Sequence, residues 1–218
     1  MAKGFTHEST YNESKEWYTP RYIFQALNVN FDLDPCSPGQ EVVPWIPTQY
    51  HYTYFDDGLN KNWFGNCWVN PPYGSDTPQW MARLSEHDEG IALVFARCDT
   101  QWFHLYAPLA TAICFISGRV QFVPSEKSEL YADAQYKPKG GCGAGSMLIA
   151  YGKENAEALV RSGLGLTLPV IRPVVDGRTG ERFGSVPSRD NENSSQNAES
   201  RQGTLFGGKN GKEKTAKI

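Results

Sequence analysis

The chain has 218 residues, of which 39% are hydrophobic and 13% aromatic, enough for one domain with a substantial core and an appendage. Its formal net charge of −3 excludes binding to DNA through a global positive field, so any nucleic-acid contact must come from a local patch. No apolar run is long enough to cross a membrane, and no secretory signal is visible.

The five cysteines are scattered along the chain and include no Cys-x-x-Cys pair. An odd set at such spacings is typical of reduced thiols in a cytoplasm, and it argues against a disulfide framework or a zinc site. The sequence therefore predicts a cytoplasmic protein that holds no metal.

The first predicted element is a helix that follows a polar N-terminus. Residues 1–16 are polar, and we expect them to be flexible. Thr19 is a good N-cap, and Pro20 suits the first position of a helix. Apolar residues then recur at helical spacing up to Leu27, so the helix is expected to end near that residue.

A short strand is predicted next, because Phe31 and Leu33 alternate with polar residues. It ends at Asp34, which is followed by a turn of small residues. Ligands of α/β sheets bind outside the carboxyl ends of strands, so Asp34 stands where a ligand would be. Residues 40–54 show no clear periodicity and predict a long loop, and residues 55–59 predict a short strand or turn.

The most informative stretch is the turn Asn70-Pro71-Pro72-Tyr73, which follows a buried strand at 67–69. The two prolines forbid both helix and ladder pairing, so the chain must leave the sheet at Asn70. Asn70 Oδ1 and the carbonyl of Pro71 can both accept hydrogen bonds from an exocyclic amine, and Tyr73 can stack on the attached ring. Fixed acceptors of this kind favour attack of the amine on an electrophilic methyl group.

The remaining pattern alternates helices with buried strands before it becomes polar. We expect helices at 77–84, 101–104 and 154–161, strands at 90–96, 112–116 and 145–151, a polar loop at 123–144, and extended chain at 166–175. Residues 176–218 have few apolar side chains and predict a disordered tail. The tail carries a net charge of +2 and the rest of the chain −5, so the tail could add slightly to DNA affinity.

Together these stretches resemble the phage-type DNA N-6-adenine methyltransferase (phage Dam) family. The resemblance runs from Trp17 to about Tyr151 and rests on the order of six motifs: Thr19-Pro20, Asp34-Pro35-Cys36, Asp57-Gly58-Leu59, Asn70-Pro71-Pro72-Tyr73, Asp99-Thr100-x-Trp102-Phe103 and Gly118-Arg119-x-x-Phe122. It implies an α/β domain over 17–175, a Rossmann-like S-adenosylmethionine-dependent methyltransferase sheet with helices on both faces. Only 36 residues separate Asp34 from Asn70, so this sheet is expected to be abbreviated.

The resemblance implies methyl transfer from S-adenosylmethionine to the exocyclic amine of a flipped adenine in double-stranded DNA, by a phage or prophage enzyme in the host cytoplasm. It implies catalytic roles for Asn70, Pro71, Pro72 and Tyr73. The implied cofactor-binding residues are Tyr18, Thr19, Pro20, Asp34, Pro35, Cys36 and Asp57, with Asp56 as the alternative to Asp57. The glycine-x-glycine that usually follows the acidic residue is missing, and only Gly39 stands in this loop.

Four basic residues are candidates for holding DNA phosphates. Arg97 and Arg119 follow buried strands, and Lys137 and Lys139 lie in the polar loop. Solvated surface charge is an equally simple explanation for each lysine.

Two other function classes stay open at this point. The same turn serves enzymes that methylate RNA or a glutamine side chain of a protein. A non-catalytic binding module is the other alternative, but the intact Asn70 and Tyr73 argue against it. The sequence leaves the recognition site and the biological role open, whether restriction evasion or regulation, and among oligomeric states it favours a monomer.

Overall fold

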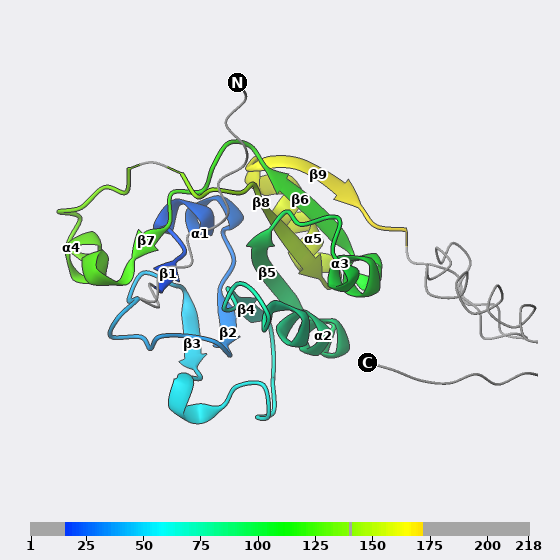
Figure 1. Cartoon of the computed structure of the whole chain (residues 1–218), viewed down its shortest axis with the longest axis horizontal. Helices are drawn as coiled ribbons and strands as arrows, with labels where there is room; N and C mark the ends of the chain where they lie inside the picture. The colour runs from blue at the N-terminus through cyan, green and yellow to red at the C-terminus, as the bar shows by residue number, and fades with distance from the viewer. Residues whose placement is uncertain (1–15, 140, 172–218) are drawn as a thin grey trace, which may run out of the picture. The chain divides into compact units, whose positions relative to one another are not determined.

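The computed structural model describes residues 16–139 and 141–171 (Figure 1). The expected flexible N-terminus, apart from Glu16, and the expected disordered tail lie outside the described residues. In chain order, the helices and strands are β1 (Trp17–Tyr18), α1 (Arg21–Leu27), β2 (Phe31–Asp34), β3 (Thr48–His51), η1 (Tyr54–Asp56), β4 (Cys67–Val69), α2 (Thr77–His87), β5 (Gly90–Phe95), α3 (Gln101–Tyr106), η2 (Ala107–Leu109), β6 (Ala112–Ile116), β7 (Val123–Pro124), η3 (Ser125–Lys127), α4 (Ser128–Ala132), β8 (Ser146–Tyr151), α5 (Lys153–Ser162) and β9 (Gly165–Pro169).

Seven strands form one mixed sheet in the order β3-β2-β4-β5-β8-β6-β9. The first four strands in this order are parallel, so their carboxyl ends lie at one edge. β8 is antiparallel to both of its neighbours, and β9 is antiparallel to β6. A separate two-stranded ladder joins β1 to β7.

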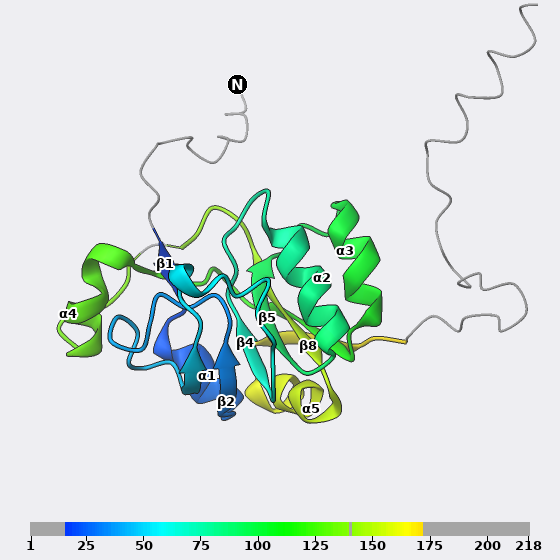
Figure 2. The same cartoon turned by 90° about the horizontal axis from the view of Figure 1, so that it is seen from below.

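Helices cover both faces of the sheet, as Figure 2 shows. One core contains apolar side chains of α1 and α5, with Trp68 of β4 at its centre, where the rings of Phe24 and Phe31 contact it. The other core lies under α2 and α3 and contains Trp80 and Trp102. This arrangement confirms the predicted α/β fold with helices on both faces.

The structure corrects two local predictions. The expected loop at 40–54 contains β3, an edge strand of the sheet. The expected polar loop at 123–144 contains β7, η3 and α4. Of the two alternatives expected at 55–59, a strand or a turn, the structure confirms the turn, which begins in the 3₁₀ helix η1. The abbreviation of the fold is real, because β3 and η1 are the only regular elements in the fully described stretch between β2 and β4.

Candidate active site at the Asn70 turn

Asn70 is fixed at the carboxyl end of β4 by a contact from a distant part of the chain. Its Nδ2 atom donates a hydrogen bond to the carbonyl of Trp17 in β1 at 3.0 Å. Because β1 is itself paired with β7, the N-terminal strand is anchored beside the turn. This contact settles the orientation of the Asn70 amide, whose Oδ1 atom accepts a hydrogen bond on the other side.

Tyr73 supplies that hydrogen bond. Its hydroxyl lies 3.0 Å from Asn70 Oδ1 and 3.3 Å from the carbonyl oxygen of Leu93. Its ring packs on Phe95 with centroids 4.1 Å apart and meets Phe122 edge-on at 6.1 Å. Burial raises the pKa of the Tyr73 hydroxyl, which is therefore a neutral donor. In this structure Tyr73 thus occupies the acceptor that we assign to the target amine, and its stacking on a base stays a prediction.

The turn is closed by Thr77, a residue that the sequence reasoning missed. Thr77 Oγ1 donates to the Pro72 carbonyl at 3.1 Å and accepts from the Gly74 amide at 3.2 Å. Gly74 has a φ of +117°, which favours glycine. The signal that could have found Thr77 is a threonine at the start of the helix that directly follows the proline pair, where its hydroxyl can satisfy free backbone groups.

Asp34 lies at the carboxyl end of β2, beside the Asn70 turn. Its side chain is 3% exposed, and its Oδ1 atom accepts a hydrogen bond from the Cys36 amide at 3.1 Å. Burial raises the pKa of this carboxyl to about 7. The Cys36 thiol in turn lies against the backbone of Asn70. The loop after β2 and the turn after β4 therefore touch, which brings Asp34, Cys36 and Asn70 into one site.

The segment after η1 packs closely on the same loop. A Cβ atom on Gly58 would collide with the carbonyl oxygen of Pro35, so only glycine fits there. Asp57 has a φ of +52° and accepts a hydrogen bond from Asn60 Nδ2 at 2.8 Å. Asp56 is engaged elsewhere, because it pairs with Lys61 at 2.8 Å. This leaves Asp57 as the better candidate of the two for a cofactor contact.

Thr19 does not cap α1 as predicted. The helix begins at Arg21, and Pro20 occupies the N-cap position without a side-chain cap. The cause is burial: Thr19 is 0% exposed, and its carbonyl accepts a hydrogen bond from Trp45 Nε1 at 2.9 Å. Its Oγ1 atom has no hydrogen-bond partner among the described residues. A buried hydroxyl without a partner costs about 1–3 kcal/mol, which a ligand with a polar group would recover.

Tyr18 is the buried residue of β1 in this region. It is 7% exposed, and its hydroxyl donates to Glu16 Oε2 at 2.7 Å. Burial, and then the hydrogen bond to Glu16, raise the pKa of this hydroxyl. The contact of Tyr18 with a cofactor stays a prediction.

A serine–histidine pair beside Asp34 was also missed. His51 lies opposite Asp34 in the β2–β3 register, and its Nδ1 atom is 2.9 Å from Ser37 Oγ. Burial lowers the pKa of His51, so the ring is neutral near pH 7. Its Nε2 atom is buried and lacks a partner in the part of the chain that the structure describes. No local signal pointed to this pair, because the sequence pattern of the strand that carries His51 predicts a loop.

The four basic residues are all exposed, and Arg97 and Arg119 lie at the same edge of the sheet. Arg97 follows β5 and Arg119 follows β6. Gly145 lies close to both arginines. Its carbonyl accepts a hydrogen bond at 2.8 Å from the amide of Ala96, the residue before Arg97. A Cβ atom built on Gly145 would lie 4.0 Å from the guanidinium group of Arg119. Lys137 and Lys139 precede this segment, and phosphate binding by all four stays a prediction.

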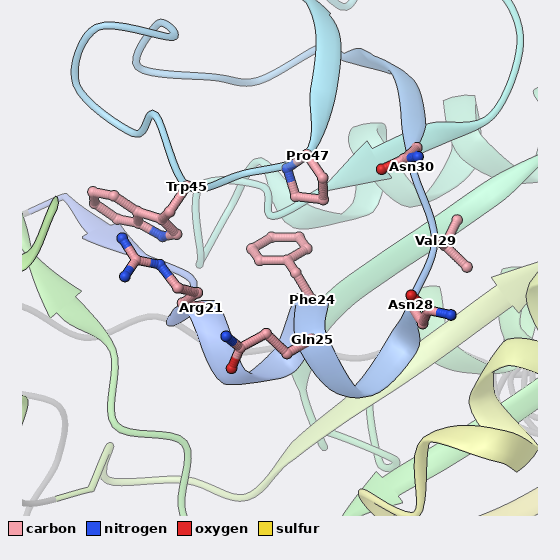
Figure 3. Close-up of a pocket in the computed structure, with 8 residues that line it drawn as sticks. All are labelled: Arg21, Phe24, Gln25, Asn28, Val29, Asn30, Trp45 and Pro47. Carbon is pink, nitrogen blue, oxygen red and sulfur yellow. The ribbon is translucent and has the colours of Figure 1, made fainter.

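A separate pocket of about 270 Å³ lies elsewhere on the domain (Figure 3). It is lined by α1 and by residues that precede β2 and β3, among them Asn30 and Pro47. These strands begin at the pocket, whereas Asp34 is the last residue of β2 and Asn70 follows the end of β4. The pocket is therefore distinct from the candidate active site.

The fold and the site together define a Rossmann-like methyltransferase. The mixed sheet has four parallel strands and helices on both faces, and the Asn-Pro-Pro-Tyr turn follows β4. The family model described as DNA N-6-adenine-methyltransferase (Dam) matches residues 7–144. A DNA N-6-adenine-methyltransferase of Haemophilus phage HP1 (strain HP1c1) is 28% identical over 145 residues, 62% of this chain and 81% of that protein. No solved structure matches the chain significantly. The chain belongs to the DNA N-6-adenine-methyltransferase (Dam) family, which confirms the resemblance inferred from the motifs.

Residues 16–139 and 141–171 contain no group of three or more histidine, cysteine, aspartate or glutamate side chains that could hold a metal ion. Within the same ranges, no helix has the length and apolar character needed to span a membrane.

Proposed function

We propose that the protein transfers a methyl group from S-adenosylmethionine to the N6 amine of an adenine flipped out of double-stranded DNA, in the cytoplasm of a bacterial host. The observation that carries this proposal is the geometry around Asn70. A turn at the end of β4 holds one amide oxygen at the strand edge where the buried carboxyl of Asp34 lies. The N-terminal segment that bonds to Asn70 carries Thr19, whose buried hydroxyl has no partner among the described residues. Family membership supplies the substrate class.

The donor set suits a cofactor with a cationic amino-acid end. Burial holds the pKa of Asp34 at about 7, so a nearby ammonium group would favour the ionised carboxylate. Thr19 offers a buried hydroxyl that has no partner among the described residues. We assign Tyr18, Thr19, Pro20, Asp34, Pro35, Cys36 and Asp57 to this site. When bound, the cofactor supplies an electrophilic methyl group.

The residues of the turn prepare the amine. Asn70 Oδ1 and the Pro71 carbonyl accept its two N–H groups, which leaves the nitrogen lone pair free to attack. Tyr73 must give up its hydrogen bond to Asn70 before the amine can take that acceptor. We assign Tyr73 to stacking on the captured adenine. Arg97, Arg119, Lys137 and Lys139 hold flanking phosphates.

The test is transfer of a radiolabelled methyl group from S-adenosylmethionine to unmethylated duplex DNA, followed by nucleoside analysis. RNA and total protein serve as parallel acceptors. Label in N6-methyl-2′-deoxyadenosine from the DNA supports the proposal. Label confined to RNA or to protein glutamine would contradict it in favour of another amino-methyltransferase.

A further inference from the structure

Two neighbouring aromatic side chains of η1 stand almost entirely in solvent. Tyr54 is 93% exposed and Phe55 is 95% exposed, and their rings meet edge-on with centroids 5.8 Å apart. We refer to these two residues as the aromatic pair. Large apolar side chains grouped on a surface in this way are typical of a binding site.

The segment that carries the aromatic pair is held by specific contacts on both sides. Thr53 and Asp56 form a reciprocal capping box around η1, and Lys61 pairs with Asp56. Behind it, Trp63 Nε1 donates to the Gly58 carbonyl at 2.7 Å, and Gly58 packs on Pro35. The rings are therefore presented by a braced turn, so their exposure does not result from a loose loop.

The aromatic pair borders the active site. Figure 1 shows η1 directly beyond the end of β3. Tyr52 connects the two: its amide donates to the Asp34 carbonyl at 2.9 Å, and its carbonyl accepts from the Ser37 amide at 3.0 Å. The loop after Asp34 contacts the backbone of Asn70. The two rings thus stand on the edge of the sheet to which the target adenine must come.

The charges around the aromatic pair favour contact with bases over contact with phosphates. Residues 54–61 carry two carboxylates and one ammonium group, a net charge of −1. Asp56 is neutralised by Lys61, and Asp57 is bonded to Asn60. A segment of this kind cannot attract the DNA backbone. Aromatic rings, by contrast, stack on any base.

Building on the proposed function, we propose that Tyr54 and Phe55 contact the base stack of duplex DNA beside the flipped adenine. A flipped base leaves a gap in the stack, and apolar wedges at such steps hold a duplex open. The aromatic pair would therefore lower the cost of extruding the adenine without taking part in methyl transfer.

The test compares the double variant Tyr54→Ala/Phe55→Ala with the parent in the full chain. The control is Val160→Ala/Leu166→Ala, since these residues are 67% and 62% exposed on α5 and β9. The first substrate is a duplex with one unmethylated adenine that the parent enzyme is known to methylate. The second is the same duplex with that adenine opposite an abasic site. We expect a loss of about 10- to 100-fold on the paired duplex and near-parent rates on the unpaired target. The double variant Tyr54→Trp/Phe55→Trp keeps two aromatic rings and should therefore retain the parent rate on paired DNA.

Three results would overturn this proposal. An equal loss on paired and unpaired targets would exclude a role in opening the duplex. Weaker binding of S-adenosylmethionine by the alanine double variant would place the rings at the cofactor. If the alanine double variant methylates paired DNA at the parent rate, the rings have no function in extruding the adenine. Each of these three results can be obtained only if the parent enzyme methylates DNA. If the parent itself fails to methylate DNA, it is the proposed function that is wrong.

Discussion

Replacing Asn70 by alanine should nearly abolish methyl transfer and leave the fold intact. Asn70 is the side chain of the turn that we assign to accept the target amine. Removing a comparable hydrogen bond to the reacting group costs about 10²–10³ in rate. A loss of this size should be seen in single-turnover experiments at saturating donor and DNA, where binding defects no longer contribute.

The expected loss of stability is smaller and can be worked out from the contacts. Asn70 makes two side-chain hydrogen bonds, to Trp17 and to Tyr73, and each contributes about 0.5–1.5 kcal/mol. Tyr73 keeps its contact with the Leu93 carbonyl at 3.3 Å. The variant should therefore lose about 1–3 kcal/mol in total and melt about 2–12 °C below the parent, at about 2–4 °C for each kcal/mol lost.

Asn70→Asp is the matched control, because a carboxylate oxygen still accepts at this position. We expect partial activity from it and cofactor binding close to the parent from both variants, measured by calorimetry. If Asn70→Ala methylates DNA at the parent rate, the catalytic assignment of the turn is wrong. If it fails to bind S-adenosylmethionine, Asn70 acts chiefly by supporting the cofactor site.

Four further predictions follow from the same geometry. Tyr73→Ala should weaken capture of the target base by about 1–3 kcal/mol, measured as KM for DNA, whereas Tyr73→Phe should retain capture because the ring remains. Folding raises the pKa of Asp34 from 3.8 to about 7, so between these pH values the folded protein keeps a proton that the unfolded chain loses. The free energy of unfolding without cofactor should therefore fall as pH rises through this range. An Asp34→Asn variant that shows the same fall in denaturant titrations would refute this. Gly58→Ala should lower both the melting temperature and the affinity for S-adenosylmethionine, since its Cβ collides with the Pro35 carbonyl; unchanged values would show that the loop has room to move. Deleting residues 176–218 should leave the melting temperature and cofactor binding unchanged, because the buried apolar residues of the described chain lie between Tyr18 and Leu159; a large drop in melting temperature would contradict this.

The turn at Asn70 and the buried strands could be predicted because their signals are local. Two consecutive prolines exclude a continued strand whatever surrounds them, and the apolar run at 112–116 matches β6 residue for residue. The Asp34 strand end was found for the same reason, since an Asp-Pro step closes an alternating run.

Features that depend on distant partners could not be predicted. β3 is an edge strand whose Tyr50 is 58% exposed, so it lacks the apolar alternation by which strands are recognised. Thr19 has the sequence of an N-cap but is buried beside Trp45, 26 residues away. The contact between His51 and Ser37 depends on the β2–β3 register, which no short window of sequence contains.

The central position of β8 has a consequence for how the chain acquires its structure. All six of its residues are buried, and it pairs along its length with β5 on one side and with β6 on the other. Until residues 146–151 leave the ribosome, β5 and β6 each present an unpaired apolar edge, and the half of the sheet that carries Asn70 has no connection to β6. Contacts of such long sequence separation form slowly, because a large loop must close first. The nascent enzyme should therefore depend on rapid completion of its synthesis, or on a chaperone, to avoid edge-to-edge association before β8 is inserted.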